Sequence, residues 1–324
     1  MTPWRVAVGA GLGVSLLIGL VAAAFLWPVT TANPQHVKLA VAGPEQATVA
    51  VERQLGARNG ELFDFTDVTD RNAAVEAIEL REVQGAIVVG ERTEILTTSA
   101  GSPQVAQLLT RMGNAMSRPQ PGQRAPEVAV TDVVPGGRAG AAGTLTMLPG
   151  LIGGIAGAVV SLVLVRTPVR RFATLGTVAV VGGLIGTAVL GPWFDVSQGN
   201  YWLLAAALGM GILAIGSVIA GLGTLLGRPG MALGVLLVVL VGNPWGGLFA
   251  PREFLAEPMG TIGAYLPNGR VAELLRSINF FPDAPTSAHW LVLGLWAVVG
   301  LALLALGTAL SRRASTAASP NATA

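Results

Sequence analysis

The chain has 324 residues, of which 52% are hydrophobic and only 12% are charged, with a net charge of +2 and no cysteine. So low a charged fraction excludes an ordinary soluble domain, in which about 25% of the residues are charged. The small net charge, without a basic run interleaved with aromatic residues, argues against a nucleic-acid partner, and the lack of cysteine excludes disulfides and thiolate metal sites.

Six charge-free apolar runs are predicted to be transmembrane helices, because each approaches the roughly 20 residues that cross a bilayer core. They cover residues 6–27, 144–165, 172–190, 201–226, 231–249 and 290–310. The first run is also compatible with a signal peptide. We expect an uncleaved anchor over residues 1–27, since the run exceeds a typical signal core and no clear cleavage site follows it.

Arginine placement predicts the orientation of these spans. If the chain crosses six times, seven basic residues fall on one side: Arg5, Arg166, Arg170, Arg171, Arg228, Arg312 and Arg313. The alternate short loop, 192–200, has neither Arg nor Lys. Basic residues favour the cytoplasmic side, so we expect a multi-pass protein of the bacterial cell (plasma) membrane. Both termini would be cytoplasmic, including a disordered tail over residues 312–324.

Residues 28–143 then form one extracytoplasmic insert. Strand-like alternation at 36–43, 62–69, 85–90 and 93–101 is separated by helical patterns at 44–59, 70–84 and 102–117. Asp70 and Ser102 are suited to begin two of these helices. Residues 118–143 resemble a linker with one further strand at 127–134. The pattern predicts a small α/β domain with a mostly parallel sheet, followed by a five-helix transmembrane domain over residues 144–311.

No motif for catalysis or nucleotide binding is found, so the chain is not expected to be an enzyme or to hold a cofactor or metal. His36 and His289 are interpreted as isolated residues at the membrane surface, although a metal site is the alternative. Asp64, Asp67 and Asp70 have a spacing that could bind a cation, but a solvated strand edge and helix cap are the better interpretation of them. The predicted spans also lack the ionisable residue typical of ion-coupled transporters.

Glycine is abundant in the spans, with Gly150/Gly154, Gly153/Gly157 and Gly182/Gly186 at the spacing that lets helix backbones approach closely. Two explanations remain open at this point. The glycines allow tight packing within one chain, or they serve helices that slide or dimerise.

The charged, proline-containing segment before the last span is predicted to lie on the outer side, within an outer hairpin over residues 250–289. Pro251 would open a first short helix whose apolar face includes Phe254, Leu255, Met259 and Ile262. Asn268 would cap a second helix with an apolar stripe formed by Val271, Leu274, Leu275 and Ile278. Neither helix is long enough to cross the bilayer, so the hairpin is expected to be re-entrant or to lie in the interface.

In this layout the chain resembles the permease subunits of type-2 ABC transporters, within them the phage-infection-protein-like branch. That family has one span, a large extracytoplasmic insert and five further spans. Segments 74–89 and 130–137 resemble parts of the family's insert. The last loop carries the family's pattern at Gly246, Gly247, Phe249, Pro251, Glu253, Pro258, Pro267, Leu275 and Arg276.

The resemblance implies an exporter of an amphipathic or lipid-like substrate that works as a homodimer or paired permease with a separate cytoplasmic ATPase. The outer gate would involve Gly247, Phe249, Pro251, Glu253, Pro258, Pro267 and Arg276. The ATPase would contact the loop that contains Arg166, Arg170 and Arg171. The alternative is a non-transporting membrane protein whose extracytoplasmic domain binds a cell-envelope ligand or partner.

Overall fold

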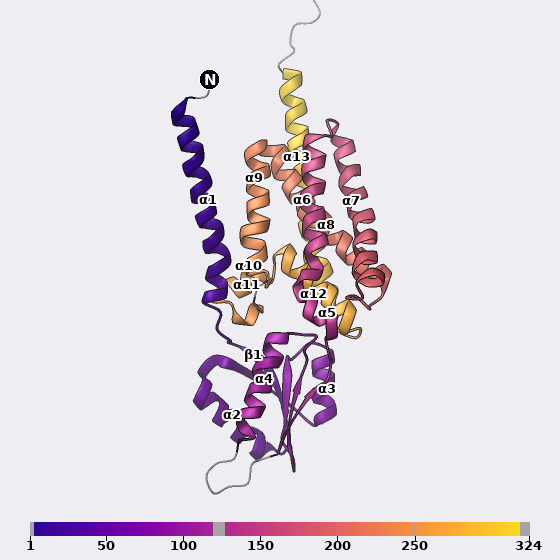
Figure 1. Ribbon diagram of the computed structural model, residues 1–324. Coiled ribbons are helices and arrows are strands. Elements are labelled where there is room, and N and C mark those ends of the chain that lie inside the picture. Colours follow the sequence, from indigo (N-terminus) through magenta and orange to yellow (C-terminus); the bar gives the residue numbers. More distant parts are fainter. Residues whose placement is uncertain (1–2, 119–126, 249, 318–324) are drawn as a thin grey trace, which may run out of the picture.

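The computed structural model describes residues 3–118, 127–248 and 250–317, and its helices divide the chain as the hydropathy predicts (Figure 1). Six helical segments of the described chain are long and apolar enough to cross a membrane. They are α1 (Trp4–Thr30), η2–α6 (Leu145–Val163), α7–η3 (Pro168–Trp193), α8 (Tyr201–Leu226), α9–η4–α10 (Arg228–Trp245) and α13 (Ser287–Arg313 of Ser287–Ala317). The fold is therefore that of a polytopic helical membrane protein.

Helix α8 is the centre of the bundle and packs against α6, α7, α9 and α13. Glycines allow these contacts, because a methyl group on Gly209 would lie 2.7 Å from the carbonyl oxygen of Ala179. One on Gly221 would lie 2.6 Å from that of Gly300. Gly150, Gly153 and Gly154 of α6 likewise face side chains of α8. These glycines thus serve close packing within one chain.

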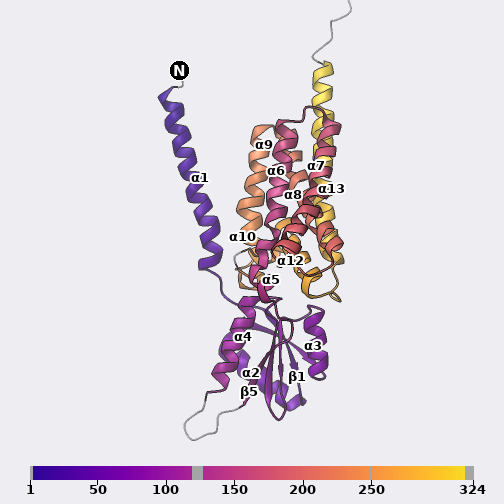
Figure 2. The ribbon, with the colours of Figure 1, turned by 45° about the vertical axis from the view of Figure 1, so that its right-hand side comes forward.

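Helix α1 stands apart from this bundle along most of its length (Figures 1 and 2). None of its most apolar window is buried, and it approaches the other helices at η4 and α10. An apolar helix so exposed has to be covered by lipid or by another protein surface.

The insert forms a five-stranded sheet in the order β2-β1-β3-β4-β5. Its strands are β1 (Val37–Ala42), β2 (Phe63–Val68), β3 (Gly85–Val88), β4 (Thr93–Thr97) and β5 (Val128–Asp132). All neighbouring pairs are parallel except β3 and β4, which are antiparallel. The predicted mostly parallel α/β domain is therefore present, and its fifth strand lies where the linker was expected to contain one.

Helices cover both faces of this sheet. One core joins the sheet to α2 (Glu45–Asn59) and α4 (Pro103–Met116), and the other joins it to α3 (Arg71–Glu79). Asp70 caps α3 as predicted, since its carboxylate accepts a hydrogen bond from the Ala73 N–H at 2.9 Å. Ser102 accepts from the Val105 N–H at the start of α4. A short helix, α5 (Gly137–Ala142), leads from the domain back to the bundle.

The segment before the last span departs from prediction in two ways. The expected first helix is instead a 3-10 turn, η5 (Arg252–Phe254), and a five-residue helix, α11 (Met259–Gly263), separated by the extended Leu255. The second helix, α12, runs from Pro267 to Phe280 and its N-cap is Leu266, so Asn268 is not its cap. The Asn268 side chain is instead buried and donates to the Asn243 amide oxygen at 2.5 Å and to the Val238 carbonyl at 3.1 Å.

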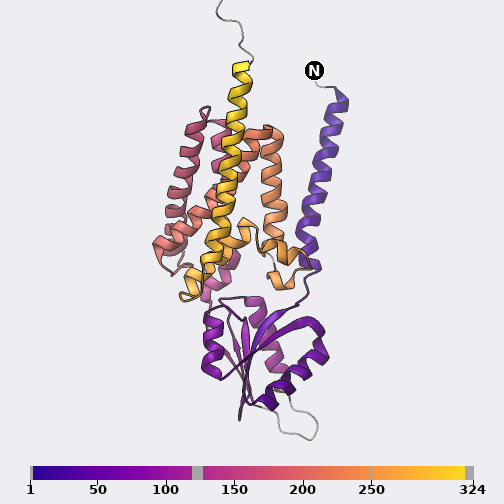
Figure 3. The same cartoon turned by 180° about the vertical axis from the view of Figure 1, so that it is seen from behind.

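The α/β domain lies at one end of the bundle, and both described chain ends lie at the other (Figures 1 and 3). The α6–α7 and α8–α9 turns, which carry Arg166 and Arg228, are at that same far end, whereas the segment η5–α11–α12 lies beside the domain. At the C-terminus, α13 continues to Ala317, six residues into the predicted disordered tail, and the rest of that tail lies outside the described residues.

Candidate functional site

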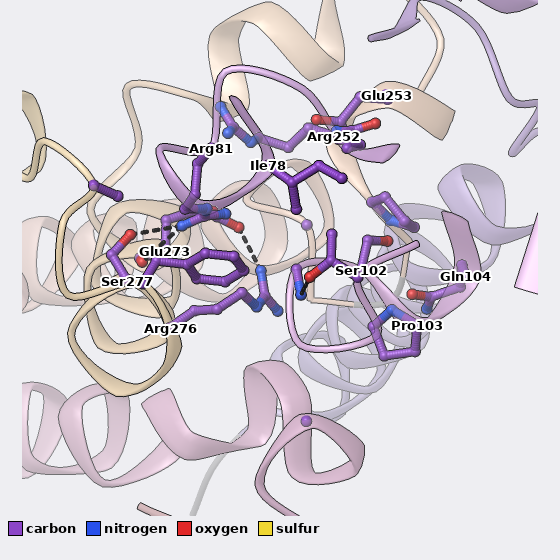
Figure 4. Close-up of a pocket in the computed structure, with 18 of the residues that line it drawn as sticks. Ile78, Arg81, Ser102, Pro103, Gln104, Arg252, Glu253, Glu273, Arg276 and Ser277 are labelled. Carbon is purple, nitrogen blue, oxygen red and sulfur yellow. Dashed lines mark hydrogen bonds and ion pairs between the residues drawn. The ribbon is translucent and has the colours of Figure 1, made fainter. Parts of the chain in front are cut away.

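A cavity of about 750 Å³ lies between the α/β domain, the hairpin of residues 250–289 and the start of α13. The domain contributes the end of α3, the turn that follows it, and the start of α4. The membrane part contributes the turn before η5 and one face of α12 (Figure 4). Pockets for small organic ligands have volumes of roughly 300–1,000 Å³, so the cavity is large enough for such a molecule.

Arg81 reaches from the domain into this junction. It follows α3 in a Schellman motif, in which the Arg81 N–H donates to Ile78 and the Glu82 N–H donates to Ala77. Its φ angle of 61° is one that glycine usually adopts at this position. An arginine there costs on the order of 1 kcal/mol, and its side chain makes the contacts that offset this cost.

Those contacts join the domain to α12. Arg81 forms an ion pair with Glu273, and its Nη1 donates to the Ser277 hydroxyl at 2.7 Å and to the Glu273 carbonyl at 3.3 Å. The other carboxylate oxygen of Glu273 accepts from Arg276 at 2.6 Å. The Arg81 guanidinium also lies 5.2 Å from the ring centroid of Phe281. We call the cluster Arg81–Glu273–Arg276 the ionic junction.

Burial and charge act in opposite directions on this junction. Burial by itself raises the pKa of Glu273, but the positive charges of Arg81 and Arg276 outweigh it and hold that pKa well below its usual range. Burial lowers the pKa of Arg276, which Glu273 partly opposes. An arginine retains its proton despite such a shift, so the junction contains two positive charges and one negative charge.

The residues predicted to form the gate divide into two groups. Gly247, Pro251, Glu253 and Arg276 line the cavity. Pro258 and Pro267 do not belong to its wall; they precede α11 and open α12, respectively. Phe249 lies outside the described residues.

The hairpin has a second attachment, to the linker between α1 and β1. The Asn33 N–H donates to the Phe254 carbonyl at 2.9 Å, and the Gln35 N–H donates to the Glu253 carbonyl at 3.0 Å. The Gln35 side chain donates to the Leu255 carbonyl at 2.8 Å. The turn η5 is therefore held by the linker, while α12 is held by the ionic junction.

The proposed partner-binding loop is at the opposite end of the bundle, and its three arginines differ. Arg171 is partly buried and donates to the Val165 carbonyl at 3.0 Å and to the Thr224 hydroxyl at 3.2 Å. These bonds tie α7 to the end of α6 and to α8. Arg166 and Arg170 are exposed, so they are the members of this set whose side chains are accessible to another protein.

The histidines and acidic residues considered for metal binding have other partners. His36 lies 3.1 Å from Asp64, whose hydrogen bond and charge raise the pKa of His36. His289 accepts from Arg270 at 3.1 Å, and Asp70 caps α3. Within residues 3–118, 127–248 and 250–317, no group of three or more His, Asp or Glu side chains is placed to hold a metal ion.

The fold and the cavity define a multi-pass helical membrane protein with a small α/β domain joined to one end of its bundle. Comparison of the chain with protein-family models, with characterised proteins and with solved structures found no match.

Proposed function

We propose that this chain is the membrane subunit of an ABC-type exporter, similar to the phage-infection-protein-like permeases, and that it moves an amphipathic or lipid-like substrate. One observation carries the proposal: the hairpin between the last two spans is joined to the inserted domain around a cavity at one end of the bundle. The short basic loops lie at the other end, where a cytoplasmic ATPase would bind.

In this proposal the segment η5–α11–α12 is the outer gate. Helix α12 packs against α8 and α13, inside the end of the bundle, while η5 and the second half of α12 border the cavity. Irregular backbone is tolerated at membrane depth only where protein or a water-filled cavity surrounds it, which suits a re-entrant hairpin here. Movement of this hairpin would open the bundle towards the cavity.

The exposed α1 supports a paired assembly. Its side chains are not covered by its own bundle, so a second permease copy or lipid would cover them. A homodimer or a paired permease would place two such helices at the contact between the copies.

The alternative function is binding without transport, and the cavity favours it. The cavity lies outside the bundle, whereas a void among Ile215, Val238 and Trp296 inside it has a volume of only about 10 Å³. On this alternative, the α/β domain would bind a cell-envelope ligand or partner, and the closely packed helices would serve as an anchor.

Affinity purification in mild detergent tests the proposed function, because we expect an ATPase to co-elute with the chain. Exchanging both Arg166 and Arg170 for glutamate should reduce the co-eluting ATPase by about tenfold or more, since reversal removes attraction and adds repulsion. The control is Arg171→Gln, which removes bonds within the bundle and should lower thermal stability with a smaller effect on co-elution. Failure of any ATPase to co-elute with the unmodified chain would favour the anchor function.

The orientation is tested separately by cysteine labelling, which is simple in a chain without native cysteine. In intact cells, a cysteine at Arg166 is expected to resist an impermeant thiol reagent, whereas one at the exposed Glu91 of the domain should react. Opening the cells should make the first site reactive. Ready labelling of the first site in intact cells would contradict the proposed topology.

A further inference from the structure

The cavity at the ionic junction has both apolar and charged walls. Its apolar wall residues include Leu80, the 57%-exposed Leu145, Pro251 and Pro285. Its basic wall residues are Lys38, Arg81, Arg252 and Arg276, and its acidic ones are Glu82, Glu253 and Glu273. A ligand that fills this space would contact both apolar and charged side chains.

The basic groups of this wall have more hydrogen-bonding capacity than the protein uses. Glu273 is shared by two guanidinium groups, each of which can donate five hydrogen bonds. Within the part of the chain that the structure describes, Arg276 donates a single side-chain hydrogen bond, to Glu273, and the side chains of Lys38 and Arg252 donate none. Three cationic side chains therefore border the cavity with donors to spare.

The acidic side chains of the wall do not occupy these unused donors. Glu273 already accepts from Arg81 and Arg276, and Glu82 is exposed. Among the described residues, Glu253 forms no ion pair with the neighbouring Arg252. With four basic and three acidic side chains in the wall, and with the most buried carboxylate already neutralised, the cavity is suited to an anion.

The position of the cavity indicates that its ligand also has an apolar part. The cavity lies where two spans end, since its wall includes Gly246 and His289, which adjoin Trp245 and Trp290 in the sequence. Tryptophan is enriched at the depth of lipid headgroups. A molecule at this level can place an anionic group in the cavity while its apolar part contacts Leu80, Leu145 and the adjoining membrane.

We propose that this cavity binds an amphiphile with an anionic phosphate or carboxylate head, and that Lys38, Arg252 and Arg276 hold that head. Phosphate and carboxylate match the planar donors of arginine, so the head would take the donors that Glu273 leaves free. This inference names the substrate class and so rests on the proposed function, but the site would bind the same ligand if the chain only anchored the domain.

Binding is measured on the purified full chain in nanodiscs of neutral lipid, without an ATPase, so a failure of transport and a failure of binding are separate results. The probes are octyl phosphate, inorganic phosphate, octyl glucoside and octyltrimethylammonium. Each is titrated by calorimetry into nanodiscs that contain the chain and into nanodiscs of lipid alone. We expect saturable binding of octyl phosphate to the chain. Inorganic phosphate, the neutral octyl glucoside and the cationic amphiphile should each bind at least about tenfold more weakly, because each lacks one of the two recognised features.

Substitutions locate the site. Lys38→Gln and Arg252→Gln should each weaken octyl phosphate binding by about tenfold, as expected for loss of a hydrogen bond to a charged group. Neither residue belongs to the ionic junction, so both variants should keep the fold. Gln107→Trp, on the exposed cavity face of α4, should weaken binding by filling the space. The matched control is Arg53→Gln on α2, which removes the same charge from an exposed position of the same domain.

Four results would overturn the proposal. They are no saturable binding of octyl phosphate, equal binding of octyltrimethylammonium, equal binding of inorganic phosphate, and equal weakening by Arg53→Gln. No saturable binding would show that the site does not exist. Equal binding of octyltrimethylammonium would show that it does not prefer anions, and equal binding of inorganic phosphate would show that it does not need an apolar part. Equal weakening by Arg53→Gln would show that the site is not in this cavity.

Discussion

Replacing Glu273 with glutamine is expected to destabilise the union of the α/β domain and the bundle by about 3–5 kcal/mol. The side chains of Arg81, Glu273 and Arg276 are only 22%, 16% and 14% exposed. The substitution leaves two positive charges close together with no negative charge between them. The matched control is Glu127→Gln, which removes a carboxylate from an ion pair with Arg92 that is 67–73% exposed and should change stability by at most about 1 kcal/mol.

The same substitution should alter the response to acid. Because the pKa of Glu273 is depressed in the folded state, its contribution is fully present above its unfolded pKa, about 4.3, and is lost as the pH falls through its folded pKa. The unmodified chain should therefore begin to lose the stability of this junction below about pH 4, with the loss growing as the pH falls further, and Glu273→Gln should lack this component. Hydrogen exchange at the end of α3 and along α12, followed from pH 7 to pH 3, measures both effects. Equal exchange in the variant and the unmodified chain would contradict them.

Much of the architecture could be predicted because it depends on patterns that are local in the sequence. Charge-free runs of about 20 residues identify spans without knowledge of their neighbours. The strands and helices of the insert follow from alternation and from caps such as Asp70, whose hydrogen bond to Ala73 closes within three residues. Such signals do not depend on how the chain folds back on itself.

The ionic junction could not be found in this way, because its members are 192 residues apart along the chain. Arg81 falls within a segment that simply continues the pattern of α3, and Glu273 resembles an ordinary charge on the wet face of an amphipathic helix. The sequence does not show that α3 ends at Glu79 or that Arg81 follows it at a position where glycine is usual; the structure shows both. An arginine in a left-handed conformation indicates that something outside the helix holds it.

The prediction that Asn268 caps α12 was wrong because a familiar local pattern was present, but a distant contact decides the role of the residue. Asparagine is a common cap, and its position one residue after Pro267 suited one. In the structure, however, its amide enters the bundle and bonds with Asn243 at the end of the fifth span. A polar group so deeply buried needs a partner, and this partner lies 25 residues earlier in the chain, on the other side of the hairpin, so no pattern near Asn268 indicates it.

Gly263→Ala is expected to displace the hairpin of residues 250–289 from the bundle and to destabilise it by about 1–3 kcal/mol. A methyl group on Gly263 would collide with the Trp245 carbonyl oxygen and approach the Gly246 nitrogen to 3.4 Å. Gly269 of α12 packs against the same Trp245–Gly246 backbone, because a methyl group added to Gly269 would lie 2.7 Å from the Gly246 carbonyl oxygen. The contacting atoms belong to the backbone, so a change of side-chain rotamer cannot relieve the clash.

The matched control is Gly294→Ala in α13, where an added methyl group meets no heavy atom within 4 Å. That change should be neutral or stabilising by up to about 1 kcal/mol, since alanine is the better helix former. Hydrogen exchange over residues 252–266 and thermal unfolding in nanodiscs distinguish the two variants, and similar behaviour would show that the glycine contact does not hold the hairpin. If Gly263→Ala loosens the hairpin but leaves the ionic junction protected, then α11 and α12 are held by separate contacts. The part of the hairpin nearest the fifth span could then move while α12 remains attached to the α/β domain.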